Sequence, residues 1–116
     1  MSIFISIVGL NHYYGSQIFS IDQILKLKKD YENKYDDEAI QVELENVGKV
    51  GYVANSPYTV ARGTRSAGRI YDTFEEILYC KVTFILKDTV IAEITDPTLN
   101  IFYESIKIHE SKGVIF

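Results

Sequence analysis

The residues of this chain best suited to bind an anion are its arginines, and all three lie within one stretch of eight residues. Arg62, Arg65 and Arg69 alternate there with two glycines and two hydroxyl-bearing residues. Glycines let backbone N–H groups converge on an anion, and the planar guanidinium group matches the geometry of phosphate. The stretch lacks the GxxxxGK[ST] pattern of a Walker A loop. It therefore predicts phosphate contact, and the alternative is a surface loop whose arginines pair with nearby carboxylates.

Tyrosine is the second residue type that could contact a ligand. The chain has nine tyrosines and no tryptophan, and Tyr13, Tyr35 and Tyr52 each stand beside residues typical of turns. An aromatic ring is a platform for an unpaired nucleic-acid base and contributes about 1–3 kcal/mol per stacked base. The alternative is that tyrosine rings pack inside the fold with their hydroxyl groups at its rim. Composition alone favours that alternative for any single tyrosine.

Metal binding and catalysis have less support in the sequence. The acidic run at 36–38 lacks the spacing and the glycine of an EF-hand loop, and His12 and His109 are far apart. Cys80 is the only cysteine, which excludes an intrachain disulfide and a CxxC zinc site. The GxSxG and HExxH motifs are absent. We therefore predict a protein without enzymatic activity, cofactor or metal ion.

Alternation of apolar and polar residues indicates β-strands along most of the chain. Residues 40–44 put three aliphatic side chains on one face and two polar side chains on the other. The same pattern in residues 78–84 predicts that four side chains face a core, namely Leu78, Cys80, Val82 and Phe84. The remaining predicted strands are 3–8, 25–28, 90–94 and 105–108.

Signals for helices are sparse. Ser20–Asp22 or Ser56–Pro57 is predicted to open one short helix, because serine caps helix N-termini and proline suits the first turn. Thr73–Ile77 is a candidate for the start of another. Many short strands separated by turns favour a barrel or sandwich over a parallel sheet. With no linker and no internal repeat, residues 1–116 are expected to form a single, mainly β domain.

The overall charge limits the kind of partner. The chain carries a formal net charge of -4 and a pI of about 5.1, which argues against coating long nucleic acids by charge alone. A local basic site on an acidic surface stays compatible with these values. The N-terminal residues lack the features of a signal peptide, and no apolar run reaches the roughly 20 residues of a membrane span. We therefore expect a soluble cytoplasmic protein that does not bind membranes.

Four segments, in order along the chain, resemble the HIRAN domain family. The most specific is Asn33–Val42, preceded by Leu25–Leu27, because it is similar to the family signature N-x-Y-D-x-x-A-I-x-V. Gly9–Gly15 resembles the family's opening segment with its aromatic pair, and Lys49–Val53 resembles its I-G-Y-V strand. A short helix expected after residue 53 is the fourth. The similarity covers roughly residues 3 to 95, and residues 62–72 look like an elaboration found in stand-alone bacterial members.

The resemblance implies a small OB-like β-barrel of about six strands with one or two short helices. It also implies a nucleic-acid-binding module that grips the 3′ end of single-stranded DNA, with a role in DNA repair or remodelling. Carried over by motif, Tyr13 and Tyr35 would hold the terminal base and Asp36 would accept the 3′-hydroxyl. A carboxylate suits a hydroxyl donor and repels a terminal phosphate.

The chain departs from the DNA-binding members of this family at basic positions. His12 stands where they have an arginine, Tyr52 stands where they have a histidine, and Asn55 is near a family lysine. Two charges that would face phosphates are therefore missing or weakened. Two outcomes follow from this: either the affinity for DNA is low, or the arginine stretch described above supplies charge from another direction.

Two other functions stay open. The first is a protein–protein interaction or assembly domain, including a homo-oligomer, that has kept the barrel without the DNA pocket. The acidic net charge and the apolar segments Leu99–Tyr103 and Val114–Phe116 favour it. The second is a small enzyme of phosphate chemistry, built on the arginine stretch with the carboxylate of Asp36 or Asp72. Neither a general base nor a set of metal ligands is evident for such an enzyme.

Overall fold

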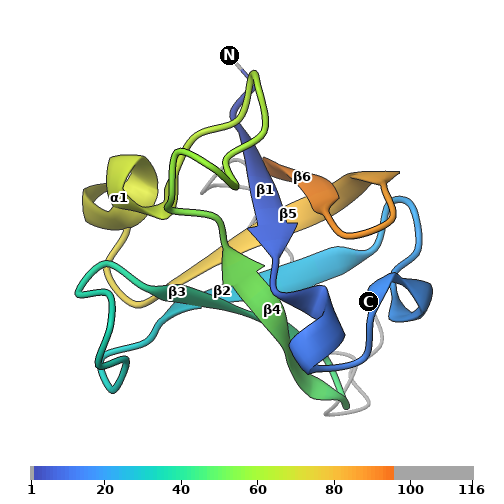
Figure 1. Cartoon of the computed structure of the whole chain (residues 1–116), viewed down its shortest axis with the longest axis horizontal. Helices are drawn as coiled ribbons and strands as arrows, with labels where there is room; N and C mark the ends of the chain where they lie inside the picture. Colours follow the sequence, from blue (N-terminus) through green and yellow to red (C-terminus); the bar gives the residue numbers. More distant parts are fainter. Residues whose placement is uncertain (1, 96–116) are drawn as a thin grey trace, which may run out of the picture.

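A closed antiparallel β-barrel of six strands is the main feature of the computed structural model, which describes residues 2–95 (Figure 1). The strands are β1 (Phe4–Val8), β2 (Ile24–Lys29), β3 (Ile40–Leu44), β4 (Gly48–Val53), β5 (Ile77–Ile85) and β6 (Val90–Ile94). Their order around the barrel is β1-β4-β3-β2-β5-β6, so β1 pairs with both β4 and β6. The predicted mainly β fold class, a small OB-like barrel, is confirmed.

Alternating apolar side chains build the core of the barrel, as the sequence pattern predicts. Leu27 of β2 is paired with Val42 of β3 on one side and with Leu78 of β5 on the other, and all three are buried. Burying one such aliphatic side chain contributes about 1.5–3 kcal/mol relative to leaving it exposed. The lysines at positions 26 and 28 alternate with these residues and lie on the outer face. The core therefore fixes which side chains of each strand can reach a ligand.

The prediction that Phe84 faces the core is wrong. Its side chain is 61% exposed, although Leu78, Cys80 and Val82 earlier in β5 are buried as predicted. The register between β5 and β6 shifts between Val82 and Phe84, which leaves Thr83 as an extra residue. Such a β-bulge moves the following side chain to the opposite face of the sheet. Apolar alternation in the sequence gives no sign of the extra residue.

The predicted helix starts are also wrong. Ser56 begins only an isolated turn, and Ser20–Asp22 belongs to a turn that does not continue as a helix. Thr73 ends a short 3₁₀ helix, and β5 begins four residues later. Within residues 2–95 the one α-helix is α1 (Ala67–Ile70), which Ser66 caps by accepting a backbone N–H bond. The expected short helix after β4 thus exists, but it lies within the arginine stretch.

Residues 96–116 lie outside the described part of the chain. The predicted strand at 105–108, His109 and the two apolar segments of the C-terminal region fall there. That residues 1–116 form a single domain therefore stays a prediction. In the part that the structure describes, no helix is long and apolar enough to cross a membrane.

Gly51 of β4 lies where the barrel leaves no room for a side chain. A Cβ atom at this position would stand 2.8 Å from the carbonyl oxygen of Val8, and 3.1 and 3.2 Å from side-chain carbons of Ile7 and Leu10. These contacts come from β1 and from the 3₁₀ helix η1 (Leu10–His12) that follows it. The glycine of the G-Y pair therefore lets β1 and η1 approach β4 closely.

We expect Gly51→Ala to lower the free energy of unfolding by about 1–3 kcal/mol, the usual cost of overpacking. The backbone of β1 would have to shift to accept the new methyl group. Chemical denaturation followed by circular dichroism measures this loss. Val47→Ala, at a partly exposed position in the β3–β4 turn, is the control and should change stability by less than about 0.5 kcal/mol. Equal losses in the two variants would contradict the close packing.

Candidate nucleic-acid interface

Tyr13 and Tyr52 lie next to each other where η1 packs against β4. Tyr13 directly follows η1, and its N–H donates to the carbonyl oxygen of Leu10. Tyr52 stands on the outer face of β4, opposite Gln41 of β3 and Val8 of β1. The two ring centroids are 6.5 Å apart and the ring planes are tilted by 48°. Because both side chains are partly exposed, the pair forms an aromatic surface rather than part of the core.

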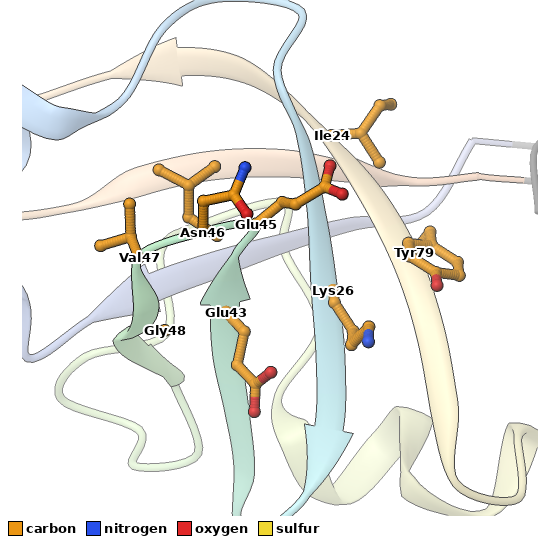
Figure 2. Close-up of a pocket in the computed structure, with 9 residues that line it drawn as sticks. Ile24, Lys26, Glu43, Glu45, Asn46, Val47, Gly48 and Tyr79 are labelled. Carbon is orange, nitrogen blue, oxygen red and sulfur yellow. The ribbon is translucent and has the colours of Figure 1, made fainter. Parts of the chain in front are cut away.

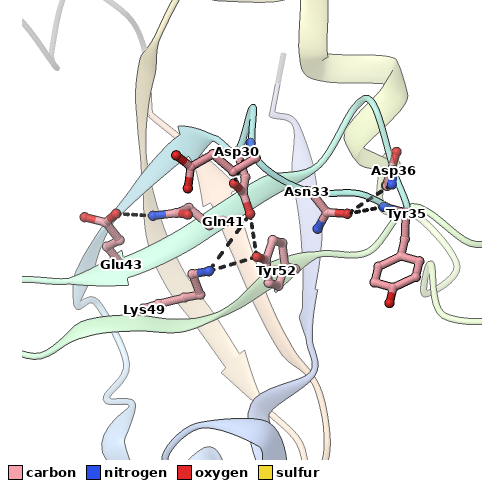
Figure 3. A network of polar contacts seen from close by, with 9 residues as sticks. Asp30, Asn33, Tyr35, Asp36, Gln41, Glu43, Lys49 and Tyr52 are labelled. Atoms are coloured by element: carbon pink, nitrogen blue, oxygen red, sulfur yellow. Dashed lines mark hydrogen bonds and ion pairs between the residues drawn. The ribbon is translucent and has the colours of Figure 1, made fainter.

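A lysine that the sequence alone does not single out joins this aromatic pair, and Figure 3 shows it beside Tyr52. The ammonium of Lys49 lies 5.0 Å from the ring centre of Tyr52 and 6.0 Å from that of Tyr13. It donates to the Tyr52 hydroxyl oxygen over 2.9 Å, and that hydroxyl donates to Oδ2 of Asp30 over 2.6 Å. The same carboxylate oxygen is 4.0 Å from the ammonium. A cation, a phenol and a carboxylate thus hold one another in place beside the two rings.

A β-bulge puts Lys49 and Tyr52 on the same face of the sheet. In a regular strand, residues three apart point to opposite faces. The pairing of β3 with β4 shifts at this point: Val42 is opposite Gly51, but the next residue, Glu43, is opposite Lys49. β4 therefore has one extra residue, Val50, and the successive residues Val50 and Gly51 are both buried. The extra residue turns Lys49 outward, so that it meets Tyr52.

Burial and hydrogen bonding set the charge of this cluster. Burial raises the pKa of Tyr52 above its ordinary value, and the hydrogen bond to Asp30 raises it further. The hydrogen bond to Tyr52 raises the pKa of Lys49. At neutral pH the phenol is therefore protonated and the ammonium is charged. The cluster accordingly places one ammonium close to both rings, and the carboxylate of Asp30 lies 4.0 Å from that ammonium.

Tyr35 and Asp36 lie in the loop that joins β2 to β3. The side-chain oxygen of Asn33 accepts from the backbone N–H groups of Tyr35 and Asp36, over 2.9 and 3.0 Å. Asparagine commonly shapes turns in this way, which explains the asparagine in the sequence signature. The side chain of Tyr35 is 99% exposed and projects from the loop in Figure 3. Within residues 2–95 it therefore packs against no other side chain, and it does not pair with Tyr13.

Asp36 ties this loop to the segment after β4 and to α1. Its Oδ1 accepts from the N–H of Glu38 and its Oδ2 accepts from the side-chain amide of Asn55, both over 2.9 Å. The side-chain oxygen of Asn55 accepts in turn from the N–H of Gly68 in α1, over 2.8 Å. One aspartate and one asparagine thus join three segments that are separate in the sequence. Each Asp36 oxygen still has a lone pair for a further donor.

The arginines lie on different elements. Arg69 is exposed on α1. The backbone of Arg65 forms a bridge to Ile5, and its N–H donates to the carbonyl oxygen of Phe4 over 2.8 Å. Arg65 is therefore held along β1, which is the strand opposite β2 in the closed sheet order.

Arg62 lies in a turn that a buried serine holds against β1. The N–H of Thr64 donates to the carbonyl oxygen of Ala61, and Gly63 has a φ of 85°, which favours glycine. The fully buried hydroxyl of Ser6 accepts from the N–H of Ala61 and hydrogen-bonds the Thr64 hydroxyl. The turn borders an apolar groove, which is also lined by Phe4, Phe84, Leu86 and Ile91. This groove includes no residue of the tyrosine pair.

A second depression lies on the outer face of β2, β3 and β5 (Figure 2). Lys26 stands there between Glu43 on one neighbouring strand and Tyr79 on the other. Because Glu43 and Glu45 bring two carboxylates against one lysine, this depression suits a nucleic acid less well than the tyrosine pair does. Within residues 2–95, no three histidine, cysteine or acidic side chains gather as a metal site would require.

Of the eight predicted binding residues, three lie together around the tyrosine pair. Two more lie on the β2–β3 loop, which is bonded to that pair. His12 is exposed at the end of η1, directly before Tyr13, which packs beside Tyr52. Tyr35 and Asp36 belong to the loop whose first residue binds Tyr52. The three arginines stand at separate positions. Contact with a nucleic acid stays a prediction for all eight residues.

We expect Asn55→Ala to loosen the β2–β3 loop and α1 together, because it removes the bond to Asp36 and leaves the N–H of Gly68 without its acceptor. The free energy of unfolding should fall by about 1–3 kcal/mol, and amide hydrogen exchange at Gly68 should become faster. Asn11→Ala, which removes one exposed hydrogen bond to Asp88, is the control and should cost less than about 0.5 kcal/mol. Unchanged exchange at Gly68 would refute the anchoring role.

Comparisons with known proteins agree with this architecture. A crystal structure of the HIRAN domain of human HLTF matches with a TM-score of 0.59 and 22% identity, over 80% of this chain and 72% of that one. A crystal structure of a protein from Lactobacillus plantarum matches with a TM-score of 0.56 and 21% identity, over 81% of this chain and 93% of that one. No curated protein sequence matches the chain. The model of the HIRAN domain matches residues 1–87, which is most of the sequence, and the chain therefore belongs to the HIRAN domain family.

Proposed function

We propose that this chain is a non-enzymatic module that binds the 3′-hydroxyl end of single-stranded DNA, with a role in DNA repair or remodelling. The observation that carries the proposal is the partly exposed aromatic pair of Tyr13 and Tyr52, which a hydrogen bond joins to the first residue of the loop with Tyr35 and Asp36. Membership of the HIRAN domain family supports a binding role rather than a catalytic one.

The tyrosines supply a surface for an unpaired base. Tyr35 offers an uncovered ring on the loop whose first residue, Asp30, accepts a hydrogen bond from Tyr52, and Tyr13 and Tyr52 offer partly covered rings. Stacking one base on an aromatic ring contributes about 1–3 kcal/mol and tolerates any sequence. In the proposed complex the terminal base lies between Tyr13 and Tyr35, while Tyr52 supports the ring of Tyr13. Because the Tyr35 ring is 99% exposed, closing it over the base breaks no contact with other side chains of residues 2–95.

Asp36 supplies recognition of the strand end. Its bonds to Glu38 and Asn55 fix the orientation of the carboxylate and leave lone pairs for a hydroxyl donor. A 3′-hydroxyl can donate to this carboxylate. A 3′-phosphate at the same point would bring a second negative charge into contact with it. The carboxylate therefore favours the hydroxyl end.

The positive charge that attracts the DNA backbone must come from a few nearby side chains, because the chain as a whole carries a net charge of -4. Lys49 adjoins the tyrosine pair with its ammonium, and His12, directly before Tyr13, adds a ring N–H that can donate to a phosphate. Arg69 lies on α1, which Asn55 links to Asp36, so this arginine is the one best connected to the proposed end site. Arg62 and Arg65 would contact nucleotides farther along the strand.

Titration of fluorescently labelled single strands measures the end preference. We expect a 3′-hydroxyl strand to bind about tenfold to a hundredfold more tightly than the same strand with a 3′-phosphate, because a hydrogen bond to a charged group contributes about 1.5–3 kcal/mol. Asp36→Asn should remove most of this preference, since it removes the negative charge. Asp37→Asn neutralises the exposed carboxylate next to it and should leave the preference intact.

Equal binding of both strand ends by the wild-type protein would refute end capture. The alternative is a protein–protein interaction or assembly domain, which the exposed side chains of Phe84 and Leu86 beside Arg62 favour. Failure to bind any single strand, together with a mass above that of the monomer in light scattering, would support this alternative.

Two exposed tyrosines allow a matched test of base stacking. Tyr35→Ala should weaken binding by about 1–3 kcal/mol, the contribution of one stacked base, and should leave the melting temperature unchanged because the ring is 99% exposed. Tyr58→Ala removes a ring that is 97% exposed on another loop and should change neither quantity. Similar affinities of the two variants would show that Tyr35 holds no base.

A further inference from the structure

We infer that Lys49 binds the phosphate of the nucleotide held at the tyrosine pair, an inference that rests on the proposed function. Its ammonium lies beside both rings, 5.0 Å from the ring centre of Tyr52 and 6.0 Å from that of Tyr13. Two rings and one ammonium match the parts of a nucleotide, which combines a flat base with a single negative charge. An acidic peptide would offer the charge without the flat group.

The Lys49 ammonium keeps donors for a ligand. An ammonium group has three N–H donors, and the Tyr52 hydroxyl takes one of them over 2.9 Å. The Asp30 oxygen at 4.0 Å attracts the ammonium but is too distant to accept a hydrogen bond. The Lys49 side chain is 33% exposed, so its other donors can reach a phosphate oxygen at the surface.

The surroundings of Lys49 restrict a side chain that is otherwise flexible. A lysine on a regular strand would have several rotatable bonds and no fixed position for its charge. Here Asp30 orients the Tyr52 hydroxyl, and this hydroxyl accepts from the ammonium. The β-bulge in β4 turns the side chain toward the rings, as bulges near binding sites commonly do. A charge held in place loses less conformational entropy when it binds a ligand.

The salt dependence of single-strand binding tests this role. The logarithm of the binding constant falls linearly with the logarithm of the salt concentration, by about 0.7 per phosphate contacted. We expect Lys49→Gln to weaken binding about threefold to tenfold at low salt and to make the slope less steep by about 0.7. Lys49→Arg should keep the slope, because it keeps the charge.

Lys81→Gln is the matched control. Lys81 also has an aspartate oxygen 4.0 Å from its ammonium, that of Asp22, but it lies on β5, away from the tyrosine pair in the order of strands. Its substitution should change neither affinity nor slope. Thermal unfolding of each variant shows whether it is folded, and Lys49→Met, which keeps an apolar stem, replaces Lys49→Gln if the latter does not fold.

The outcomes separate this inference from the proposed function. A weaker Lys49→Gln complex with an unchanged slope would mean that Lys49 only positions Tyr52, and this would overturn the phosphate contact. Unchanged affinity and slope would overturn it as well. In both cases the wild-type protein still prefers the 3′-hydroxyl end. Loss of that preference in the wild-type protein would instead refute the proposed function.

Discussion

Closure of the barrel is the constraint on which the rest of the structure depends. Every strand has a neighbour on each side, and one face of each strand is buried, so alternation decides which side chains reach the surface. Two bulges, in β4 and β5, interrupt that alternation. The first brings Lys49 to the face of Tyr52, and the second turns Phe84 outward beside the turn of Arg62. The lysine beside the tyrosine pair and the apolar groove beside Arg62 thus each lie next to a β-bulge.

Outside the barrel, short polar side chains position the loops. Asn33 shapes the turn before Asp36, Asn55 joins that turn to α1, and Ser6 holds the turn at residues 61–64. These side chains satisfy backbone N–H groups that have no partner in a strand. Because one residue often bonds to two segments, the loop positions depend on one another. Asp36 is consequently both a structural link and the proposed acceptor of the strand end.

The sequence predicts the strands well because alternation directly reflects burial, as at Leu27. It does not reveal the outward positions of Phe84 and Lys49, since a bulge adds a residue without changing the composition. Helix α1 is too short to show a helical period, and its cap lies among residues that also suit a surface loop. The bond between Asp36 and Asn55 joins residues 19 apart, which no local pattern can indicate. The resemblance to the HIRAN domain family indicated which residues to expect at the site, but not which other residues they contact.

The pairing of each strand with two neighbours also limits how another molecule can bind to the barrel. Since each strand in residues 2–95 already pairs with two neighbours, no strand has a wholly free edge to which an extended peptide could add by main-chain hydrogen bonds. Recognition must come from side chains and from connecting segments, such as the one that carries Tyr35. Such segments accept insertions and exchanges more readily than strands do. Ligand preference in this architecture can therefore diverge while the barrel beneath it stays the same.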